Sequence, residues 1–239
     1  MSYYKNYLRK LSAVCKKKKL DLIEIGRVGF KKEYPTYKIV INGKGKTVCF
    51  SAGIHGYEIA GPWAILKFLE KLNVKKLKNK LIIFPVANPT GFDKNQRLNW
   101  QKKNLNALFC RKKLIGENKI LYETLEKEKV YFFHALHEDM DLKTFYLYNF
   151  EKKPEKVYRD IIKLAKKYFS IETSAKIYND KAVDGLIINR KDGSFEDRMF
   201  REGVPYSMCT ETPGKQPLKK RVELSVKIME KVIKFTQTN

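Results

Sequence analysis

Two short apolar runs, residues 81–86 (LIIFPV) and 130–136 (VYFFHAL), constrain the fold of this chain more than any other feature. Continuous apolar sequence of this length is typical of a strand that is buried on both faces. Segments with apolar residues at helical spacing, such as residues 57–72, separate such runs. Strands that alternate with helices predict an α/β protein, a three-layer α/β/α sandwich around a mixed, mostly parallel sheet.

The remaining elements follow from shorter patterns. Residues 36–42 and 46–52 flank an Asn-Gly-Lys-Gly turn, which predicts a β-hairpin, and residues 88–91 (NPTG) predict a loop. Further strands are expected at 144–150, 183–188 and 206–210, and further helices at 117–129, 154–169 and 218–235. Because no repeat, linker or change of composition divides the chain, residues 1–239 are expected to form one domain.

The composition restricts the class of protein. No window approaches the roughly 18 apolar residues of a membrane span, and the N-terminus lacks the apolar stretch of a secretory signal. The four cysteines are widely spaced and form no Cys-x-x-Cys pair, which indicates reduced thiols. We therefore expect a cytoplasmic protein with no membrane partner, and the sequence gives no indication of its oligomeric state.

The charge is strongly positive. Fifty Lys and Arg residues against 26 Asp and Glu residues give a formal net charge of +24. The basic residues form short scattered runs, without zinc-finger spacing or an RNA-binding strand pattern. This favours a solvated lysine-rich surface over a nucleic-acid or anionic-polymer binder, which stays open as an alternative. A positive protein would suit acidic substrates.

The chain has three histidines, and two of them occur beside acidic residues. His55 and Glu58 are three residues apart where an expected strand leads into a helix, so both side chains can converge on one cation. A catalytic zinc site needs a third protein ligand, and His137, directly after the run 130–136, is the candidate. His134 would point to the opposite face of a strand, so we expect it in the core or behind the ligands.

A zinc hydrolase also needs a general base and a cation for the developing oxyanion. Glu211 follows the expected strand 206–210, where partial desolvation would raise the pKa of its carboxyl group. Arg97 lies in a long loop, and its guanidinium could bind an oxyanion or a carboxylate. Each of these residues taken singly is more often structural, so the interpretation depends on the whole set.

The order of these residues resembles a known family. The matching elements are His55-x-x-Glu58, Asn88-Pro89-x-Gly91, Arg97, Asn104-Leu105-Asn106, His137 and Glu211-Thr212-Pro213. They resemble the zinc carboxypeptidases of the carboxypeptidase A type, and they are similar to the aspartoacylase and succinylglutamate desuccinylase branch of that superfamily. The resemblance implies Zn²⁺ bound by His55, Glu58 and His137. It also implies that Arg97 polarises the scissile carbonyl and that Glu211 is the general base for a metal-activated water.

The resemblance further implies a substrate pocket. Asn106 would bind substrate, and Phe195 would lie near the pocket for the substrate side chain. Ala107 stands where the family usually has an arginine that binds the terminal carboxylate of a substrate. Residues that could replace this arginine are Arg111, Asn189, Arg190 and Lys191.

Two other positions differ from the family pattern. Asn104 replaces an aspartate that orients a zinc-bound histidine, although an amide oxygen can accept the same hydrogen bond. No tyrosine lies just before Gly193, where peptidase members often have one. The sequence therefore predicts a zinc-dependent amide hydrolase acting on a peptide or an N-acyl amino acid. A metallocarboxypeptidase-like peptidase is favoured, because the chain leaves little length for the C-terminal domain of the deacylase branch. The alternatives are an N-acyl amino acid deacylase and a non-catalytic metal- or ligand-binding member of the fold.

Overall fold

The computed structural model describes residues 2–152 and 155–238. Its strands are β1 (Asp21–Val28), β2 (Tyr34–Ile41), β3 (Gly45–Ala52), β4 (Asn79–Phe84), β5 (Val130–Asp139), β6 (Tyr146–Asn149), β7 (Lys176–Ile177), β8 (Asp180–Val183), β9 (Leu186–Ile187) and β10 (Tyr206–Pro213). Its helices are α1 (Tyr3–Lys18), α2 (Ala60–Lys71), α3 (Pro89–Lys94), α4 (Gly116–Leu125), α5 (Lys156–Ala165), α6 (Phe195–Arg201) and α7 (Leu218–Thr238), with short 3-10 turns η1 (Val74–Lys76) and η2 (Leu105–Leu108).

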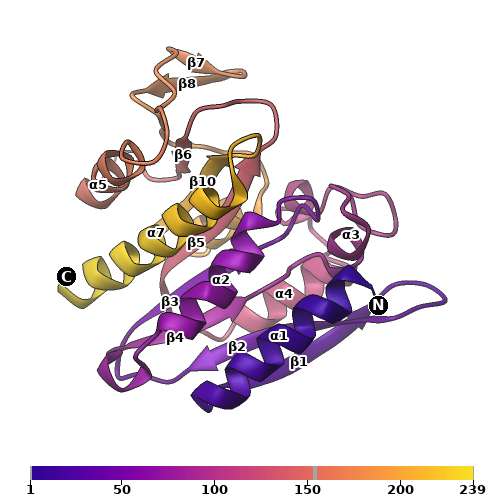
Figure 1. Cartoon of the computed structure of the whole chain (residues 1–239). Coiled ribbons are helices and arrows are strands. Elements are labelled where there is room, and N and C mark those ends of the chain that lie inside the picture. The colour runs from indigo at the N-terminus through magenta and orange to yellow at the C-terminus, as the bar shows by residue number, and fades with distance from the viewer. Residues whose placement is uncertain (1, 153–154, 239) are drawn as a thin grey trace.

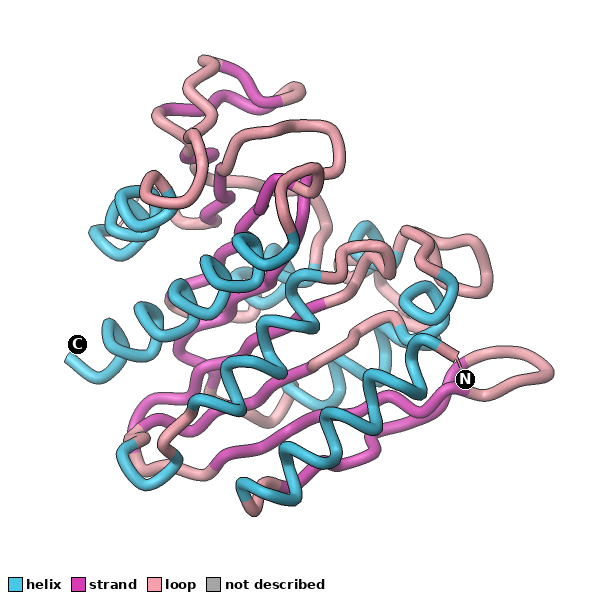
Figure 2. The backbone as a smooth tube through the Cα atoms, in the orientation of Figure 1, coloured by secondary structure: helices cyan, strands magenta, loops and turns pink. Residues whose placement is uncertain are grey.

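Helices cover both faces of one twisted sheet, so the predicted three layers are confirmed (Figures 1 and 2). Side chains of α1, α2, α5 and α7 share one apolar core, and side chains of η2, α4 and α6 share another. Neighbouring residues of β5 point into different cores, Phe132 into the first and Phe133 into the second. This double burial explains why the sequence of β5 is almost continuously apolar.

The sheet is mixed, with strand order β1-β2-β4-β3-β5-β10-β6-β9-β8-β7. Its centre is parallel, because β4, β3, β5 and β10 run in the same direction. The strands on both sides are mainly added antiparallel. The expectation of a mostly parallel sheet is therefore wrong for the sheet as a whole. Short connections force antiparallel pairing in β1–β2, β7–β8 and β8–β9, and the pairs β2–β4 and β6–β10 are antiparallel as well.

The predicted hairpin between β2 and β3 is also wrong. β4 lies between these strands and pairs with both of them. The Asn-Gly-Lys-Gly turn instead passes around the start of β4, where Gly45 N–H donates to Lys78 O at 2.7 Å. A Cβ atom at Gly43 would lie 2.2 Å from Asn79 O, so only glycine permits this close approach.

Several element boundaries differ from the predicted ones. The predicted loop 88–91 instead begins α3, which Asn88 caps by accepting from Gly91 N–H. A turn with positive φ at Asp184 and Gly185 divides residues 183–188 into β8 and β9. α1, β1 and α6 were not predicted from the sequence. The predicted helix start at Pro154 lies outside the described residues.

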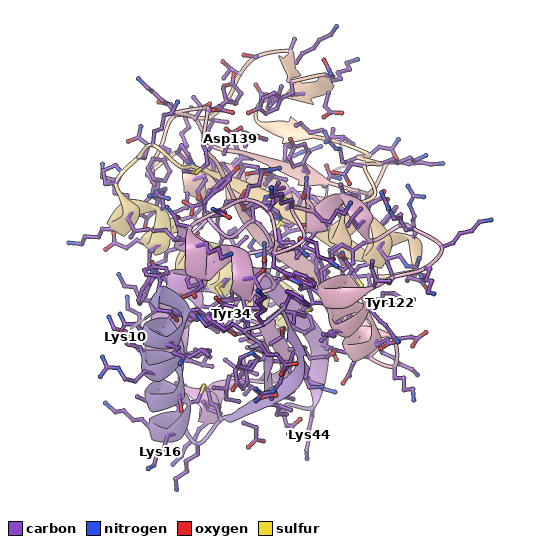
Figure 3. The ribbon with its side chains drawn as sticks, turned by 90° about the vertical axis from the view of Figure 1, so that its right-hand side faces the viewer. Lys10, Lys16, Tyr34, Lys44, Tyr122 and Asp139 are labelled. Carbon is purple, nitrogen blue, oxygen red and sulfur yellow. The ribbon has the colours of Figure 1, made fainter. Side chains whose placement is uncertain are left out.

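The lysines lie mainly on the outside. Figure 3 shows Lys10 and Lys16 of α1 and Lys44 pointing away from the body of the protein, and all three are exposed. Among the helices that the structure describes, none is long and apolar enough to cross a membrane.

Candidate active site

A tight turn after β3 brings His55 and Glu58 together. Gly53 begins it with φ +65°, and a Cβ atom at Gly56 would lie 2.0 Å from the carbonyl carbon of Gly91. Glycine is therefore required at position 56, because the turn packs directly against the α3 backbone. Glu58 N–H donates to His55 O at 3.1 Å, and the side-chain atoms His55 Nδ1 and Glu58 Oε1 are 2.6 Å apart.

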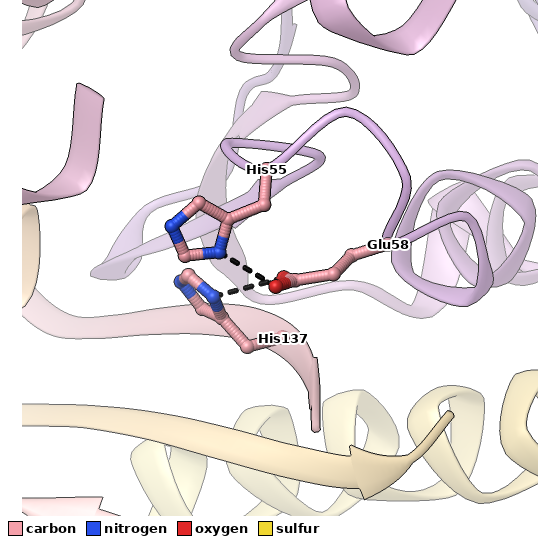
Figure 4. A group of neighbouring side chains, drawn as sticks. All are labelled: His55, Glu58 and His137. Atoms are coloured by element: carbon pink, nitrogen blue, oxygen red, sulfur yellow. Dashed lines mark hydrogen bonds and ion pairs between the residues drawn. The ribbon is translucent and has the colours of Figure 1, made fainter. Parts of the chain in front are cut away.

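His137 reaches the same point from β5 (Figure 4). Its Nδ1 lies 2.9 Å from Glu58 Oε2. His55, Glu58 and His137 are all buried, and each offers one ligand atom within 4.8 Å of the others. The structure therefore brings the three predicted metal ligands together.

The residue after His137 fixes this arrangement. Glu138 Oε2 accepts a hydrogen bond from Ala60 N–H at 2.7 Å, and Glu138 Oε1 pairs with Arg221 of α7. Its carboxylate thus holds the start of α2, where a negative charge is favourable. Because α2 begins two residues after Glu58, this contact ties the turn to the end of β5.

The outer imidazole nitrogens face oxygen atoms. His55 Nε2 lies 3.0 Å from Asn104 Oδ1, and His137 Nε2 lies 3.2 Å from Glu196 Oε1. These acceptors favour hydrogen on both Nε2 atoms, which leaves both Nδ1 lone pairs facing the Glu58 carboxylate. The Glu58 carboxylate is buried, and its two oxygens lie 2.6 Å and 2.9 Å from the Nδ1 atoms of His55 and His137. Two imidazole nitrogens and a carboxylate oxygen are a common zinc donor set, so these residues fit a zinc ion.

Protonation compensates the charges when no cation is bound. Burial alone would raise the pKa of Glu58, but His55 and His137 together outweigh it and lower that pKa to about 2. Burial also opposes the charged form of His137, yet Glu58 and Glu196 raise its pKa well above the usual value. A cation that binds here must therefore displace protons.

Glu211 faces the ligands from the neighbouring strand. The parallel register of β5 and β10 places Glu211 beside His137. Burial raises the pKa of Glu211 to about 8, with His137 opposing the shift and Glu58 and Asp139 adding to it. The thiol of Cys209 donates to Glu211 Oε1 at 3.6 Å. A carboxyl group with this raised pKa can both accept and return a proton near neutral pH.

Arg97 completes the group of predicted catalytic residues. Its Nη1 donates to Tyr57 Oη at 2.7 Å and lies 3.7 Å from Glu58 Oε1. Its side chain is 43% exposed, so the guanidinium can still reach a bound substrate.

Two cavities meet at this point. The inner cavity, of about 240 Å³, is lined among others by Asn106, Ala107, Arg190, Asp192, Glu196 and Cys209. The outer cavity, of about 450 Å³, is lined among others by Tyr57, Glu58, Asp139, Asp141 and Tyr178. His55, Arg97, Tyr148 and Glu211 line both cavities.

Two predicted substrate-binding residues lie elsewhere. Phe195 is only 1% exposed and stacks on Phe109, with ring centroids 4.1 Å apart, because it starts α6 on the side that faces the apolar core. Arg111 is exposed on a surface loop and lines neither cavity. Neither side chain lines either cavity, whereas Arg190 lines the inner one, and a substrate contact of Phe195 or Arg111 stays a prediction.

Asn106 and His134 lie near the proposed ligands, but their side chains are engaged in hydrogen bonds within the protein. Asn106 lines the inner cavity, yet its side chain accepts from Phe195 N–H and donates to Glu196 Oε2. His134 is fully buried on the opposite side of β5, with Nε2 2.8 Å from Thr210 Oγ1.

Sequence reasoning missed Glu196 as the partner of His137. A signal was present, because Ser194 and Asp197 have the spacing of a helix N-cap. Ser194 Oγ accepts from Asp197 N–H at 3.1 Å, and α6 begins there. This capping pattern alone would have placed Glu196 in a first helical turn, but not beside His137.

Glu196→Gln is expected to weaken zinc affinity about 10–100-fold, because it removes the negative charge beside His137 Nε2 and keeps the volume of the side chain. Competition with a chromophoric chelator measures the affinity. Glu151→Gln is the matched control, since Glu151 is a largely buried carboxylate that accepts from Tyr158 Oη away from the site. Equal zinc affinity of Glu196→Gln and the wild type would contradict the orienting role.

Glu211 should make the metal-free protein less stable as the pH rises. Its pKa is about 8 in the folded protein against an ordinary 4.5, so its contribution to stability is present below about pH 4.5 and is lost as the pH passes 8. We expect the Tm of Glu211→Gln to exceed that of the wild type increasingly between pH 5 and pH 8, by several degrees at the upper end. Thermal unfolding in chelator measures this, and parallel pH curves would contradict it.

Comparison with known proteins gives a consistent set of similarities. Residues 44–144 match the family model of the succinylglutamate desuccinylase/aspartoacylase catalytic domain. This range includes His55, Glu58, Arg97 and His137, whereas Glu211 lies beyond it. No curated protein sequence matches the chain significantly.

Solved structures match nearly the whole chain. A protein from Shewanella amazonensis SB2B, provisionally named a metallopeptidase, is 28% identical with a TM-score of 0.89, over 97% of this chain and 92% of that one. A protein from Shewanella denitrificans OS217 with the same provisional name is 26% identical with a TM-score of 0.86, over 96% and 89% of the two chains. A metallo-carboxypeptidase from Burkholderia cenocepacia shares the fold, at 16% identity and a TM-score of 0.78, over 98% of this chain and 69% of that one.

Proposed function

We propose that the chain, which is similar to the carboxypeptidase-like superfamily that includes aspartoacylase and succinylglutamate desuccinylase, is a zinc-dependent hydrolase that cleaves a peptide amide bond. One observation carries the proposal. The ligand group of His55, Glu58 and His137 lies beside Glu211 and Arg97, and His55, Arg97 and Glu211 line the same two cavities.

A zinc ion held by the three ligands would supply a Lewis acid for the carbonyl oxygen and would lower the pKa of water. The chain itself supplies the proton transfers. Glu211 takes a proton from the attacking water while the oxygen of that water bonds to the carbonyl carbon. Glu211 then passes that proton to the amide nitrogen as the carbon–nitrogen bond breaks, which yields a carboxylic acid and an amine.

Arg97 stabilises the charge that develops on the carbonyl oxygen. A guanidinium donor is most effective when it is fixed before the reaction. The hydroxyl group of Tyr57 and the carboxylate of Glu58 hold Arg97 at the boundary of the two cavities. The carbonyl oxygen of a bound amide is therefore expected beside Nη1.

The two cavities favour a peptide substrate. Two cavities that share His55, Arg97, Tyr148 and Glu211 in their lining together offer room for a substrate longer than a single N-acyl amino acid. A small N-acyl amino acid would need little of the outer cavity. The substrate charge is proposed from the inner cavity, which is lined by the guanidinium groups of Arg97 and Arg190, the latter paired with Asp180 and Asp192. We therefore propose an acidic residue on the side of the substrate that enters it.

A second candidate is a deacylase of N-acyl amino acids. The match of residues 44–144 to the desuccinylase/aspartoacylase model supports it, since this segment contains the three proposed zinc ligands. The inner cavity alone has a volume that would suit a small ligand.

One substrate panel distinguishes these functions. Zinc-loaded protein is incubated with N-blocked peptides ending in acidic, basic or apolar residues, and with N-acetylaspartate and N-succinylglutamate, and the released amines are measured by mass spectrometry. We expect cleavage of peptides, fastest for those with acidic residues. Cleavage of the acyl amino acids alone would establish the second candidate. No cleavage of any amide by fully zinc-loaded protein would indicate a non-catalytic binding protein.

A further inference from the structure

Tyr148 shares the position of the reacting residues but has no role in the proposed function. Four of the described residues line both cavities. His55, Arg97 and Glu211 have a role in the proposed function, and Tyr148 is the fourth. We propose that Tyr148 is a further catalytic residue, whose hydroxyl group donates a hydrogen bond to the amide group being cleaved. This inference rests on the proposed amide hydrolysis.

The strand register places Tyr148 close to Glu211. In the antiparallel pair of β6 and β10, Tyr148 lies opposite Cys209 and Tyr146 lies opposite Glu211. Opposite residues project to the same side of a sheet, as do residues two apart on one strand. Tyr148 and Glu211 are thus diagonal neighbours on one face, a relation with a typical separation of about 7–8 Å that long side chains bridge.

Neighbouring groups hold the Tyr148 ring in place. The Arg190 guanidinium carbon lies 4.6 Å from the ring centroid, and the Tyr146 ring meets it edge-on at 5.5 Å. Arg190 is in turn held by ion pairs with Asp180 and with Asp192, the latter at 3.2 Å. A donor restricted in this way needs little reorganisation during the reaction.

The hydroxyl group stays protonated. Burial and the nearby negative charge of Glu211 raise the pKa of Tyr148 well above the usual value. Tyr148 can therefore donate a hydrogen bond over the whole working pH range, while Glu211 remains the proton acceptor.

The neighbouring tyrosines are less suited to this role. Tyr146 and Tyr178 both donate their hydroxyl hydrogens to Asp139 Oδ2, at 2.6 Å and 2.8 Å. Tyr146 lines neither cavity, and Tyr178 lines only the outer one.

Tyr148→Phe tests the proposal, because it removes the hydroxyl group and keeps the ring under Arg190. With the best peptide of the substrate panel, kcat per bound zinc is expected to fall about 10–100-fold, with KM changed less than about threefold. The affinity for a phosphonate analogue of the same peptide, measured by calorimetry, should fall by a similar factor. Zinc content and Tm should equal those of the wild type.

Tyr131→Phe is the matched control, since Tyr131 lies on β5 beside Tyr206 and lines neither cavity. It should leave kcat and phosphonate affinity unchanged. An active wild type with an equally active Tyr148→Phe would overturn the role of Tyr148 and leave amide hydrolysis intact, as would a change confined to KM. A wild type that cleaves no amide would overturn both proposals.

Discussion

Glu211→Gln is expected to lower kcat about 10²–10⁴-fold and to leave the zinc content unchanged. Glutamine has the same shape and can still accept the Cys209 thiol hydrogen, but it cannot take a proton from water or return one to the leaving nitrogen. Glu211 is not among the three residues that converge as metal ligands. The effect should therefore appear in the chemical step, with KM changed little.

Steady-state kinetics on the best peptide, with zinc measured by elemental analysis, test this expectation. Glu151→Gln again serves as control, because it also neutralises a largely buried carboxyl group, one whose contacts are Tyr158, Asn149 and Ser207. Should Glu211→Gln keep more than about a tenth of the wild-type kcat, another group must be the general base.

His137→Ala is expected to weaken zinc affinity by more than about 100-fold and to abolish amide hydrolysis. Loss of a ligand costs more than loss of a residue that only orients one, for which about 10–100-fold is typical. Removal of the imidazole leaves His55 and Glu58, fewer protein ligands than a catalytic zinc site normally has. We expect near-stoichiometric zinc in the wild type and little in this variant after dialysis.

His134→Ala provides the control on the same strand. His134 lies on the other side of β5, where Phe50 and Thr210 contact it. Its loss should keep the zinc and lower the stability by about 1–3 kcal/mol, because it leaves a cavity in the core. If His134→Ala loses zinc and His137→Ala retains it, the ligand set is wrong. A wild type that takes up no zinc would refute the hydrolase.

Local sequence was sufficient to predict β5 and β10, the strands that carry His137 and Glu211. The apolar run 130–136 predicted β5, and the alternation of strands with helices predicted the layered fold. Such patterns can be recognised in the sequence because apolar residues recur every second residue in a strand with one buried face and every 3.6 residues in a helix, and are continuous in a strand buried on both faces. The odd offset between His134 and His137 likewise indicated that they lie on opposite faces of β5.

The pairing of strands that are distant in the sequence could not be predicted from local patterns. The Asn-Gly-Lys-Gly turn has the composition of a hairpin, yet β4 separates β2 from β3, because a turn sequence does not encode what inserts beside it. Phe195 and Arg111 are residue types that often line substrate pockets, yet Phe195 lies in the apolar core and Arg111 lies on the surface. Helix orientation and loop path decide such positions, and both depend on contacts across the whole fold.

The sequence by itself indicated the α/β class, the resemblance to the carboxypeptidase-like superfamily and the residue types of the candidate site. Donor atoms, a three-residue spacing and a glycine-bearing turn are local properties, so His55 and Glu58 were recognisable before any fold was known. Only the tertiary structure decided that Glu196 faces His137, that Arg190 lines the inner cavity and that Tyr148 lies beside Glu211. These residues meet because β6, β10 and α6 pack together in the fold. That packing depends on contacts between segments distant in the sequence, which no local pattern predicts.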